Sequence, residues 1–473
     1  MTQQTDKASI VAADASTPQR VNAPARSDVE ASARLEAPAS TRRFSTHVAW
    51  TFAARLVMMV NSVGAGVIVA RWLGAEGLGA LAVINVAVGV VVQLGQFGLP
   101  SANIYFIAQD KRRYLSAAAM NSLLFALAGG GALALGLSLL AYGQPGLFGH
   151  ISPRLIGIAA ASIPFQLLTL LGLNIFLAVG RIDRFNQLDV VGQSFVLVNA
   201  SVALLFIGAG LWLLVSLNTA ATILVSLVIV CLIGRHIAGL ETPTRSRLRP
   251  DLALFKRMMK YGLKFHVATL AGLLIFRADL LVVNHFRGAA EAGVYSVASQ
   301  VAMMLMMLPS VVATLLFPRV AAEEDARRDQ LTCRAARYTS LLMLAVTIAA
   351  APASFALPLL YGAPFNDASA QLLILLPGVC LVSIESVLVQ YFSATGLPIA
   401  IPLFWLLTLV VNISLTLALV PAFGARGAAL ASTICYTLIF ALVVFYFRAK
   451  TGNALSNMLL LRAEEWRALL KTR

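Results

Sequence analysis

Charged residues are scarce in this chain. Asp, Glu, Lys and Arg make up 12% of its 473 residues, whereas 59% are hydrophobic and the mean hydropathy is +0.82. Soluble globular domains carry about a quarter charged residues, so this composition excludes a soluble domain and favours a polytopic membrane protein. Apolar windows of about 20 residues, the length that crosses a bilayer, recur along nearly the whole sequence.

Several chemical motifs are also missing. The four cysteines lie in or beside apolar segments without CxxC spacing, so we interpret them as small core residues and expect neither a zinc site nor a disulfide framework. There is no GxxxxGK[ST] motif, and not one Gly-Lys dipeptide, which excludes a P-loop. HExxH and GxSxG are absent too. These absences favour secondary transport without a cofactor, coupled to H⁺ or Na⁺ if a gradient drives it, over an enzyme.

The basic excess points to a membrane surface. The net charge is +15, but the basic residues are scattered over short loops and tails rather than gathered on one face, which disfavours nucleic acid as a partner and favours membrane lipids. The first 45 residues are polar and lack an apolar segment close to the N-terminus. They predict a disordered cytoplasmic tail rather than a signal peptide.

Hydropathy predicts twelve transmembrane spans and one orientation. With both termini in the cytoplasm, 29 of the 36 Lys and Arg residues fall on the cytoplasmic side, 4 on the other side and 3 inside spans, as the positive-inside rule requires. The outer loops are short, so no outer domain is expected. The spans are near 48–70, 78–98, 115–141, 155–179, 188–208, 214–234, 262–284, 293–317, 338–361, 370–393, 399–421 and 428–447.

The predicted domains follow from these spans. An N-terminal six-helix bundle covers residues 46–240, a basic cytoplasmic linker 241–260, a C-terminal six-helix bundle 261–448 and a cytoplasmic amphipathic tail 449–473. The stretch from 455 to 471 places its apolar residues on one helical face, so it is predicted to lie along the inner membrane surface. The alternative is a soluble amphipathic helix packed on a loop.

The two halves carry an internal repeat. An offset of 214 places Gly74, Ala75, Gly79 and Val83 on Gly288, Ala289, Gly293 and Val297, and other pairs match at similar offsets. Because each half has an even number of spans, both have the same orientation, related by an axis along the membrane normal. Spans 2 and 8 are interrupted near Pro100 and Pro309, and such breaks mark transport sites unless they are only packing kinks.

Six segments in this order carry a family resemblance: residues 70–81 (ARWLGAEGLGAL), 96–109 (QFGLPSANIYFIAQ), 276–298 (FRADLLVVNHFRGAAEAGVYSVA), 315–321 (LLFPRVA), 390–398 (QYFSATGLP) and 419–432 (LVPAFGARGAALAS). In these six segments the chain resembles the multidrug/oligosaccharidyl-lipid/polysaccharide exporter superfamily. Within that superfamily it resembles the flippases for lipid-linked O-antigen or exopolysaccharide units. The resemblance implies an all-α protein with two six-helix bundles around a V-shaped central cavity, working as a monomer in the bacterial cytoplasmic membrane.

The resemblance also implies the cargo. An undecaprenyl-diphosphate-linked oligosaccharide would pass from the inner to the outer leaflet by alternating access, with a polysaccharide polymerase and a chain-length regulator as partners. The first rival is a multidrug antiporter of the same superfamily, which would carry lipophilic cations. The second, a membrane glycan polymerase or ligase, is disfavoured because such enzymes generally need a large outer loop with catalytic groups.

Ionisable residues inside the spans are the first site candidates, because a charge near the bilayer centre needs a partner or an aqueous cavity. Arg277 and Asp279 are two residues apart, about 200° around a helix, so they do not pair with each other. Asp279 is expected to face span 1 or span 8. His266, Thr269 and Arg277 fall within about 80° and predict a polar stripe that lines the cavity.

Arginine matches phosphate oxygens best, so Arg277 and Arg55 are predicted to bind the diphosphate. The alternative for each embedded charge is a structural pair that locks two helices together. Asp189 and Lys264 are explained by interfacial water near the ends of their spans. Asp279 and Glu385 are the predicted ion-coupling residues. His266, Thr269 and the amides are candidates for the sugar hydroxyls, against plain interhelical hydrogen bonds; these amides are Asn61, Asn174, Gln300 and Gln390.

Overall fold

The computed structural model describes residues 26–239 and 249–459. By its contacts, the chain divides into a unit up to Trp50 and a unit from Thr51 onward. The first helix, α1 (Arg26–Gly95), begins well before the first predicted span. Residues 26–45, predicted as disordered, are therefore helical, in keeping with their content of Ala, Glu, Arg and Leu, which are strong helix formers. The rest of the predicted tail, 1–25, lies outside the described residues.

The unit from Thr51 is helical wherever the described residues form regular structure. Three short 3-10 segments and one π-helical segment interrupt or join the helices. The N-terminal half contains the end of α1 and then α2 (Leu99–Gln109), α3 (Lys111–Gly143), α4 (Pro153–Ala160), α5 (Ile163–Ala178), α6 (Ile182–Ala200) and α7 (Leu211–Ala238). The C-terminal half contains α8 (Leu252–Arg287), α9 (Ala289–Leu305), α10 (Met307–Ala322), α11 (Asp325–Ala353), α12 (Leu357–Tyr361), α13 (Asn366–Ala394), α14 (Ala400–Thr451) and α15 (Leu455–Leu459).

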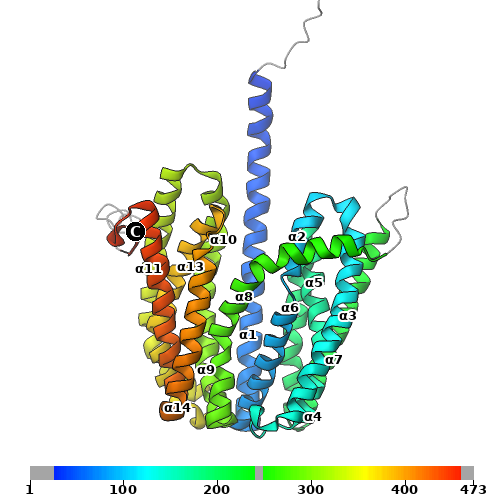
Figure 1. Cartoon of the computed structure of the whole chain (residues 1–473), viewed down its shortest axis with the longest axis vertical. Coiled ribbons are helices and arrows are strands. Elements are labelled where there is room, and N and C mark those ends of the chain that lie inside the picture. The colour runs from blue at the N-terminus through cyan, green and yellow to red at the C-terminus, as the bar shows by residue number, and fades with distance from the viewer. Residues whose placement is uncertain (1–25, 240–248, 460–473) are drawn as a thin grey trace, which may run out of the picture. The chain divides into compact units, whose positions relative to one another are not determined.

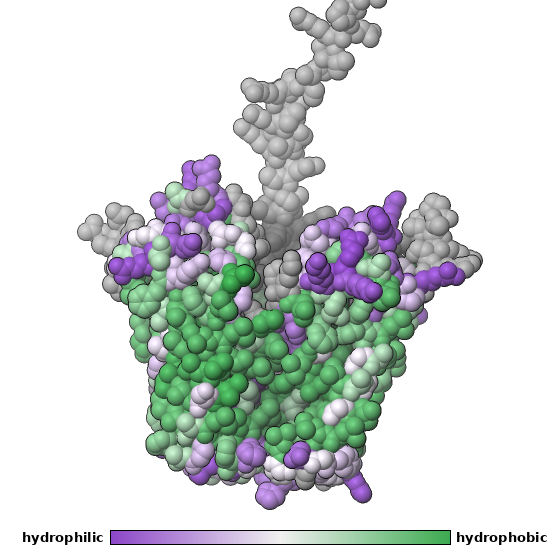
Figure 2. Space-filling view, in the orientation of Figure 1, coloured by the Kyte–Doolittle hydropathy of each residue, from purple (hydrophilic) through white to green (hydrophobic). Residues whose placement is uncertain are grey.

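The twelve predicted spans are found in ten long apolar helices of the described chain. Two of these helices each contain one residue with a non-helical backbone, Gly74 in α1 and Gly424 in α14, and each therefore holds two spans. The helices form two bundles side by side (Figure 1). On the face shown in Figure 2, an apolar band covers both bundles and hydrophilic residues lie at the two ends, as expected of a protein that spans a bilayer.

The internal repeat is visible in the backbone. Corresponding glycines of the two halves adopt positive φ angles that other residues rarely tolerate, and each pair sits at the same point of its half. The φ angles are 70° and 87° for Gly74 and Gly288, 79° and 99° for Gly180 and Gly396, and 68° and 60° for Gly208 and Gly424. In the sequence the first pair matches at an offset of 214 and the second at the similar offset of 216, whereas the third pair is seen only in the backbone.

Residues 252–260 of the predicted linker 241–260 are helical, whereas 241–248 lie outside the described residues. Helix α8 begins at Leu252, nine residues before the predicted bundle, and Asp251 caps it by accepting a hydrogen bond from the Leu254 backbone N–H at 2.9 Å. Asn121 of α3 holds this cap from the other half: its side chain donates to the Asp251 carbonyl at 2.9 Å and accepts from the Asp251 N–H at 3.0 Å.

The start of α8 packs on the N-terminal bundle before the helix turns toward the C-terminal half (Figure 1). Leu254 and Met258 are buried there, and the ring of Tyr261 stacks on that of Tyr105 at 4.3 Å. Apolar residues at i and i+4 make this segment amphipathic, so it lies along the bundle instead of forming a free linker. One continuous helix therefore belongs to both halves.

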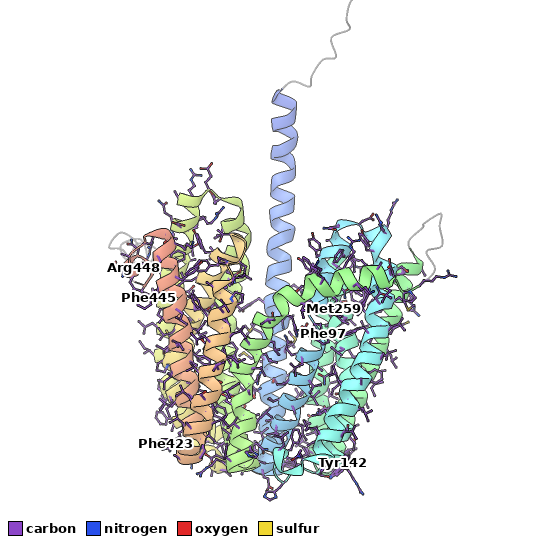
Figure 3. All side chains as sticks on the ribbon, viewed as in Figure 1. Phe97, Tyr142, Met259, Phe423, Phe445 and Arg448 are labelled. Carbon is purple, nitrogen blue, oxygen red and sulfur yellow. The ribbon has the colours of Figure 1, made fainter. Side chains whose placement is uncertain are left out.

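The two ends of the unit differ in charge. One end, which we call the basic end, carries Lys111, Arg113, Arg235, Arg257 and Arg448 at or near helix ends. Figure 3 shows Arg448 and Met259 at this end and Tyr142 and Phe423 at the other. The asymmetry agrees with the bias that the sequence predicted.

The described part of the C-terminal tail packs on protein. Met458 of α15 is fully buried, and Arg337 of α11 donates to the Asn457 carbonyl at 2.6 Å. This arrangement is closer to the alternative of a helix packed on the protein than to the predicted surface helix. The remainder of that predicted helix, 460–471, lies outside the described residues.

Candidate functional site

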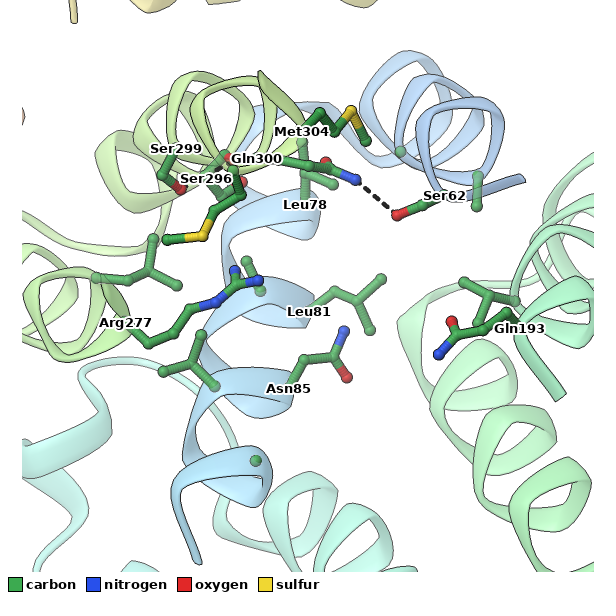
Figure 4. Close-up of a pocket in the computed structure, with 18 of the residues that line it drawn as sticks. Ser62, Leu78, Leu81, Asn85, Gln193, Arg277, Ser296, Ser299, Gln300 and Met304 are labelled. Carbon is green, nitrogen blue, oxygen red and sulfur yellow. Dashed lines mark hydrogen bonds between the residues drawn. The ribbon is translucent and has the colours of Figure 1, made fainter. Parts of the chain in front are cut away.

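A cavity of about 630 Å³ lies between the two bundles. The N-terminal half lines it with both spans of α1, with α6 and with α7, and the C-terminal half with α8, α9 and the first residue of α10. Figure 4 shows Arg277 extending from α8 into this space, with Asn85 and Gln193 facing it from the other half. Its volume is in the range of small-molecule and cofactor sites.

In the wall of the cavity that Asp279 also lines, Arg277 carries a charge that no salt bridge balances among the described residues. The nearby Asp279 is occupied elsewhere: it accepts hydrogen bonds from the hydroxyls of Tyr295 and Ser432, the latter at 3.0 Å, and from the Leu280 N–H at 2.8 Å. The predicted lack of an Arg277–Asp279 pair and the orientation of Asp279 toward span 8 both agree with this geometry.

Arg55 also lines the cavity, but it has a partner. Its guanidinium lies 3.6 Å from the carboxylate of Asp189 on α6, and the two side chains are 49% and 20% exposed. Asp189 was attributed to interfacial water, and that interpretation is corrected by this ion pair. Arg55 thus has a half-exposed charge that is partly neutralised, in contrast to Arg277.

Of the four predicted amides, Gln300 lines the cavity and donates to the Ser62 hydroxyl at 2.6 Å, which connects the two halves (Figure 4). The other three point elsewhere. Asn61 donates to Ser194, Asn174 to the Leu170 carbonyl and Gln390 to the Ser386 carbonyl, and none of them lines the cavity. These three amides form hydrogen bonds within or between helices, which was the alternative to binding the sugar hydroxyls.

The predicted stripe on α8 reaches the cavity only at Arg277. His266 is buried with its ring 5.8 Å from that of Phe97, and Thr269 is exposed without lining the cavity. The predicted stripe is interrupted because α8 bends where it leaves the N-terminal bundle (Figure 1). One face of the helix therefore does not keep the same neighbours along its length.

Glu385 lies inside the C-terminal bundle, away from the cavity. It is 1% exposed, and its Oε1 has no hydrogen-bond partner among the described residues. The predicted breaks are both present, since α2 begins just before Pro100 and α10 begins two residues before Pro309. Neither proline lines the cavity, although Met307, the first residue of α10, does.

Sequence reasoning missed several cavity residues. They are Ser62, Gln193, Ser296 and Ser299 and the methionines Met58, Met59, Met303, Met304 and Met307. The spacing of Ser296, Ser299 and Gln300 at i, i+3 and i+4 is the signal that would have placed them on one face of α9.

The two halves are in contact at the end opposite to the basic end, which we call the closed end. A Cβ atom on Gly79 would collide with the Ala289 carbonyl, and one on Gly293 would collide with the Ala75 carbonyl. These two contacts are related by the repeat. Arg71 also donates to the carbonyls of Leu359 and Leu360, at 2.6 and 2.8 Å. The cavity is therefore sealed at this end by backbone contacts between the bundles.

Known proteins share this fold. The chain superimposes on an inward-facing multidrug resistance transporter of the MATE family of the MOP superfamily with a TM-score of 0.67 and 15% identity, covering 86% of this chain and 98% of that one. With an outward-facing conformation of a MATE family transporter the TM-score is 0.52. With the lipid II flippase MurJ in an inward closed conformation it is 0.64, at 16% identity over 84% of this chain and 87% of that one.

Relatives in sequence come from Haloferax volcanii. One, described as a probable low-salt glycan biosynthesis flippase, Agl15, is 21% identical over 401 residues, or 81% of this chain and 80% of the relative. Another, a probable flippase, AglR, is 23% identical over 167 residues, or 34% of this chain and 35% of the relative. Residues 68–370, more than half of the chain, match the model of the polysaccharide biosynthesis protein family, and the chain belongs to that family.

Proposed function

We propose that this protein is a flippase that moves an undecaprenyl-diphosphate-linked oligosaccharide, a repeat unit of O-antigen or exopolysaccharide, across the bacterial cytoplasmic membrane. Its family membership, its relatives among glycan flippases and its fold, shared with MurJ, all support this role. It acts as a transporter rather than an enzyme, and its product would pass to a polymerase and a chain-length regulator.

The charge of Arg277 is the observation that carries the proposal. A cation inside a bilayer protein costs at least a few kcal/mol unless a partner or water compensates it. Arg277 has no paired carboxylate among the described residues, and its guanidinium faces a cavity large enough for a ligand. A diphosphate supplies the missing anion, and the fork of donors on arginine matches its oxygens.

The conformation supports alternating access. The halves touch at the closed end, and the fold matches an inward-facing transporter better than an outward-facing one. Since the basic end of a membrane protein faces the cytoplasm, the cavity would receive cargo from the inner leaflet, with both chain termini cytoplasmic. The protein would work as a monomer.

Transport would be coupled to H⁺ or Na⁺ through Asp279 or Glu385. Glu385 is the stronger of the two candidates, because one of its oxygens lacks a partner among the described residues, whereas Asp279 is held by three hydrogen bonds. A buried carboxyl group without a partner is a natural place to take up a proton.

A multidrug antiporter is the second candidate, and the methionines favour it. Five methionine side chains line the cavity, and flexible thioethers adapt to apolar ligands of varied shape. A lipophilic cation, however, would meet the charge of Arg277, so this candidate explains the methionines and leaves the arginine without a role.

The test is to replace Arg277 in the cells that make the protein. Arg277→Ala should abolish surface polysaccharide, with the lipid-linked unit retained on the cytoplasmic side, and Arg277→Lys should restore part of it. Arg154→Ala, at an exposed arginine of the closed end, is the matched control and should leave export unchanged. Full polysaccharide with Arg277→Ala would refute the assignment, and new sensitivity to cationic drugs would favour the antiporter.

A further inference from the structure

A second cavity, of about 640 Å³, lies within the N-terminal bundle. Both spans of α1, the end of α4 and helices α5, α6 and α7 form its walls. Ser62, Asn85, Gln193 and Asn218 line both this cavity and the central one, so the two spaces adjoin along these side chains. We call the second space the side cavity. A cargo in the central cavity would reach it without leaving the protein.

The side cavity has a mixed lining, in which about half of the residues are apolar and the rest are polar but nearly free of charge. Among the described residues that line it, Asp189 alone is ionisable, and Arg55 pairs with it at 3.6 Å. The other polar groups are neutral amides and hydroxyls from α1, α5, α6 and α7 and from Ser162, the residue before α5. Such a lining suits a ligand that presents both hydroxyl groups and apolar faces better than a free ion, which needs an opposite charge.

Some of these groups have no partner within the protein. The Nε2 of Gln93 and the Oγ1 of Thr169 are buried without a hydrogen bond to any described residue. Buried polar atoms cost free energy when unpaired, so water or a ligand must satisfy them. Thr222 and Gln166 add a hydroxyl and an amide that are already bonded to protein through one atom and retain further bonding capacity.

The dimensions suit an extended ligand. On α6 the lining runs from Leu188 to Asn199, about 16 Å along the helix axis at about 1.5 Å per residue. Phe195, midway along this wall, offers an aromatic ring. The combination of many neutral donors and acceptors with a ring face matches a chain of sugars, which presents hydroxyl groups and C–H faces along its whole length.

We infer that the side cavity binds the glycan of the cargo, while Arg277 and Arg55 in the central cavity face its diphosphate. This inference rests on the proposed function and deepens it, because it assigns the neutral sugar part to the N-terminal bundle. The protein would then select its cargo by two separate features, charge in the central cavity and hydroxyl pattern in the side cavity.

The test compares two cargoes in proteoliposomes with the purified full-length protein. One cargo is an undecaprenyl-diphosphate-linked monosaccharide and the other an undecaprenyl-diphosphate-linked oligosaccharide. Gly192→Leu fills the side cavity, because a Cβ at this glycine meets only Val225, at an ordinary 3.6 Å, and the leucine extends beyond it. Val191→Leu is the matched control, since this neighbour on α6 is 50% exposed and does not line the cavity. Gln166→Leu removes an amide while keeping the size of the side chain.

We expect Gly192→Leu and Gln166→Leu to slow oligosaccharide transport by about tenfold or more, the effect of one or two lost contacts. Monosaccharide transport should stay within about twofold of wild type, and Val191→Leu should leave both cargoes unchanged. Unchanged oligosaccharide transport in both variants would mean that the cavity holds only water, and equal loss of both cargoes would mean a general defect; either result overturns the inference. If the wild type moves neither cargo, the proposed function itself fails.

Discussion

The closed end offers the sharpest prediction, because two glycines related by the repeat hold it together. A Cβ on Gly79 would lie 2.7 Å from the Gly293 backbone nitrogen and closer still to the Ala289 carbonyl. A Cβ on Gly293 would lie 2.9 Å from the Gly79 nitrogen and closer to the Ala75 carbonyl. Gly79→Ala and Gly293→Ala must therefore separate the halves at this end.

The magnitude follows from the type of contact. Forcing a methyl group into a packed backbone contact costs about 1–3 kcal/mol. This cost applies only in the conformation in which the two halves touch at the closed end. Each change also gains up to about 1 kcal/mol because alanine favours helix over glycine, but it does so in every conformation. Because this gain cancels between the two states, the ratio of closed to open molecules at this end should fall by about 5- to 150-fold for a cost of about 1–3 kcal/mol.

Electron–electron double resonance measures this opening directly. Spin labels on Tyr142→Cys and Phe423→Cys report the distance between the halves at the closed end, in a background whose four cysteines are replaced by alanine (Figure 3). Both glycine variants should shift the distribution to longer distances, and by similar amounts because the repeat makes their contacts equivalent. Gly136→Ala, where a Cβ meets no atom within 4 Å, is the control. An unchanged distribution in either glycine variant would refute the reasoning.

Three further predictions test other parts of the molecule. Arg55→Ala should reduce transport more than Asp189→Asn in a flipping assay, because only the first removes a cation from the cavity; the reverse order would show that the pair is merely structural. Asn121→Ala should lower the free energy of unfolding by about 1–3 kcal/mol, since it removes the two hydrogen bonds that the Asn121 side chain makes with the Asp251 backbone; an unaltered melting temperature would contradict this. Glu385→Gln should remove the dependence of transport on a pH gradient, and persistence of that dependence would exclude Glu385 from coupling.

Much of the fold was predictable because it depends on local hydrophobicity. Spans follow from runs of apolar residues, and the breaks at Gly74 and Gly288 follow from a residue type that alone adopts positive φ at low cost. The repeat was found by the same kind of matching. The beginning of α8 was missed because its residues are too polar for a span, although Asp251 and Leu254 carry a recognisable cap.

The candidate site was predictable only in part. The sequence established that Arg277 and Asp279 could not pair along their helix, since that depends on helical geometry alone. It did not establish which amides face the cavity, because an asparagine such as Asn174 satisfies its own helix as readily as a ligand. It also could not join Arg55 to Asp189, which are far apart in the chain and meet through the packing of α1 on α6.

The sequence by itself determined twelve membrane crossings, two repeated halves of equal orientation and the presence of embedded charges, because each of these depends on composition and spacing along one chain. The tertiary structure alone decided which charge remains without a counter-ion, which polar side chains surround open space and where the halves touch. These properties depend on the rotation and bending of each helix against its neighbours, which no local pattern of residues fixes.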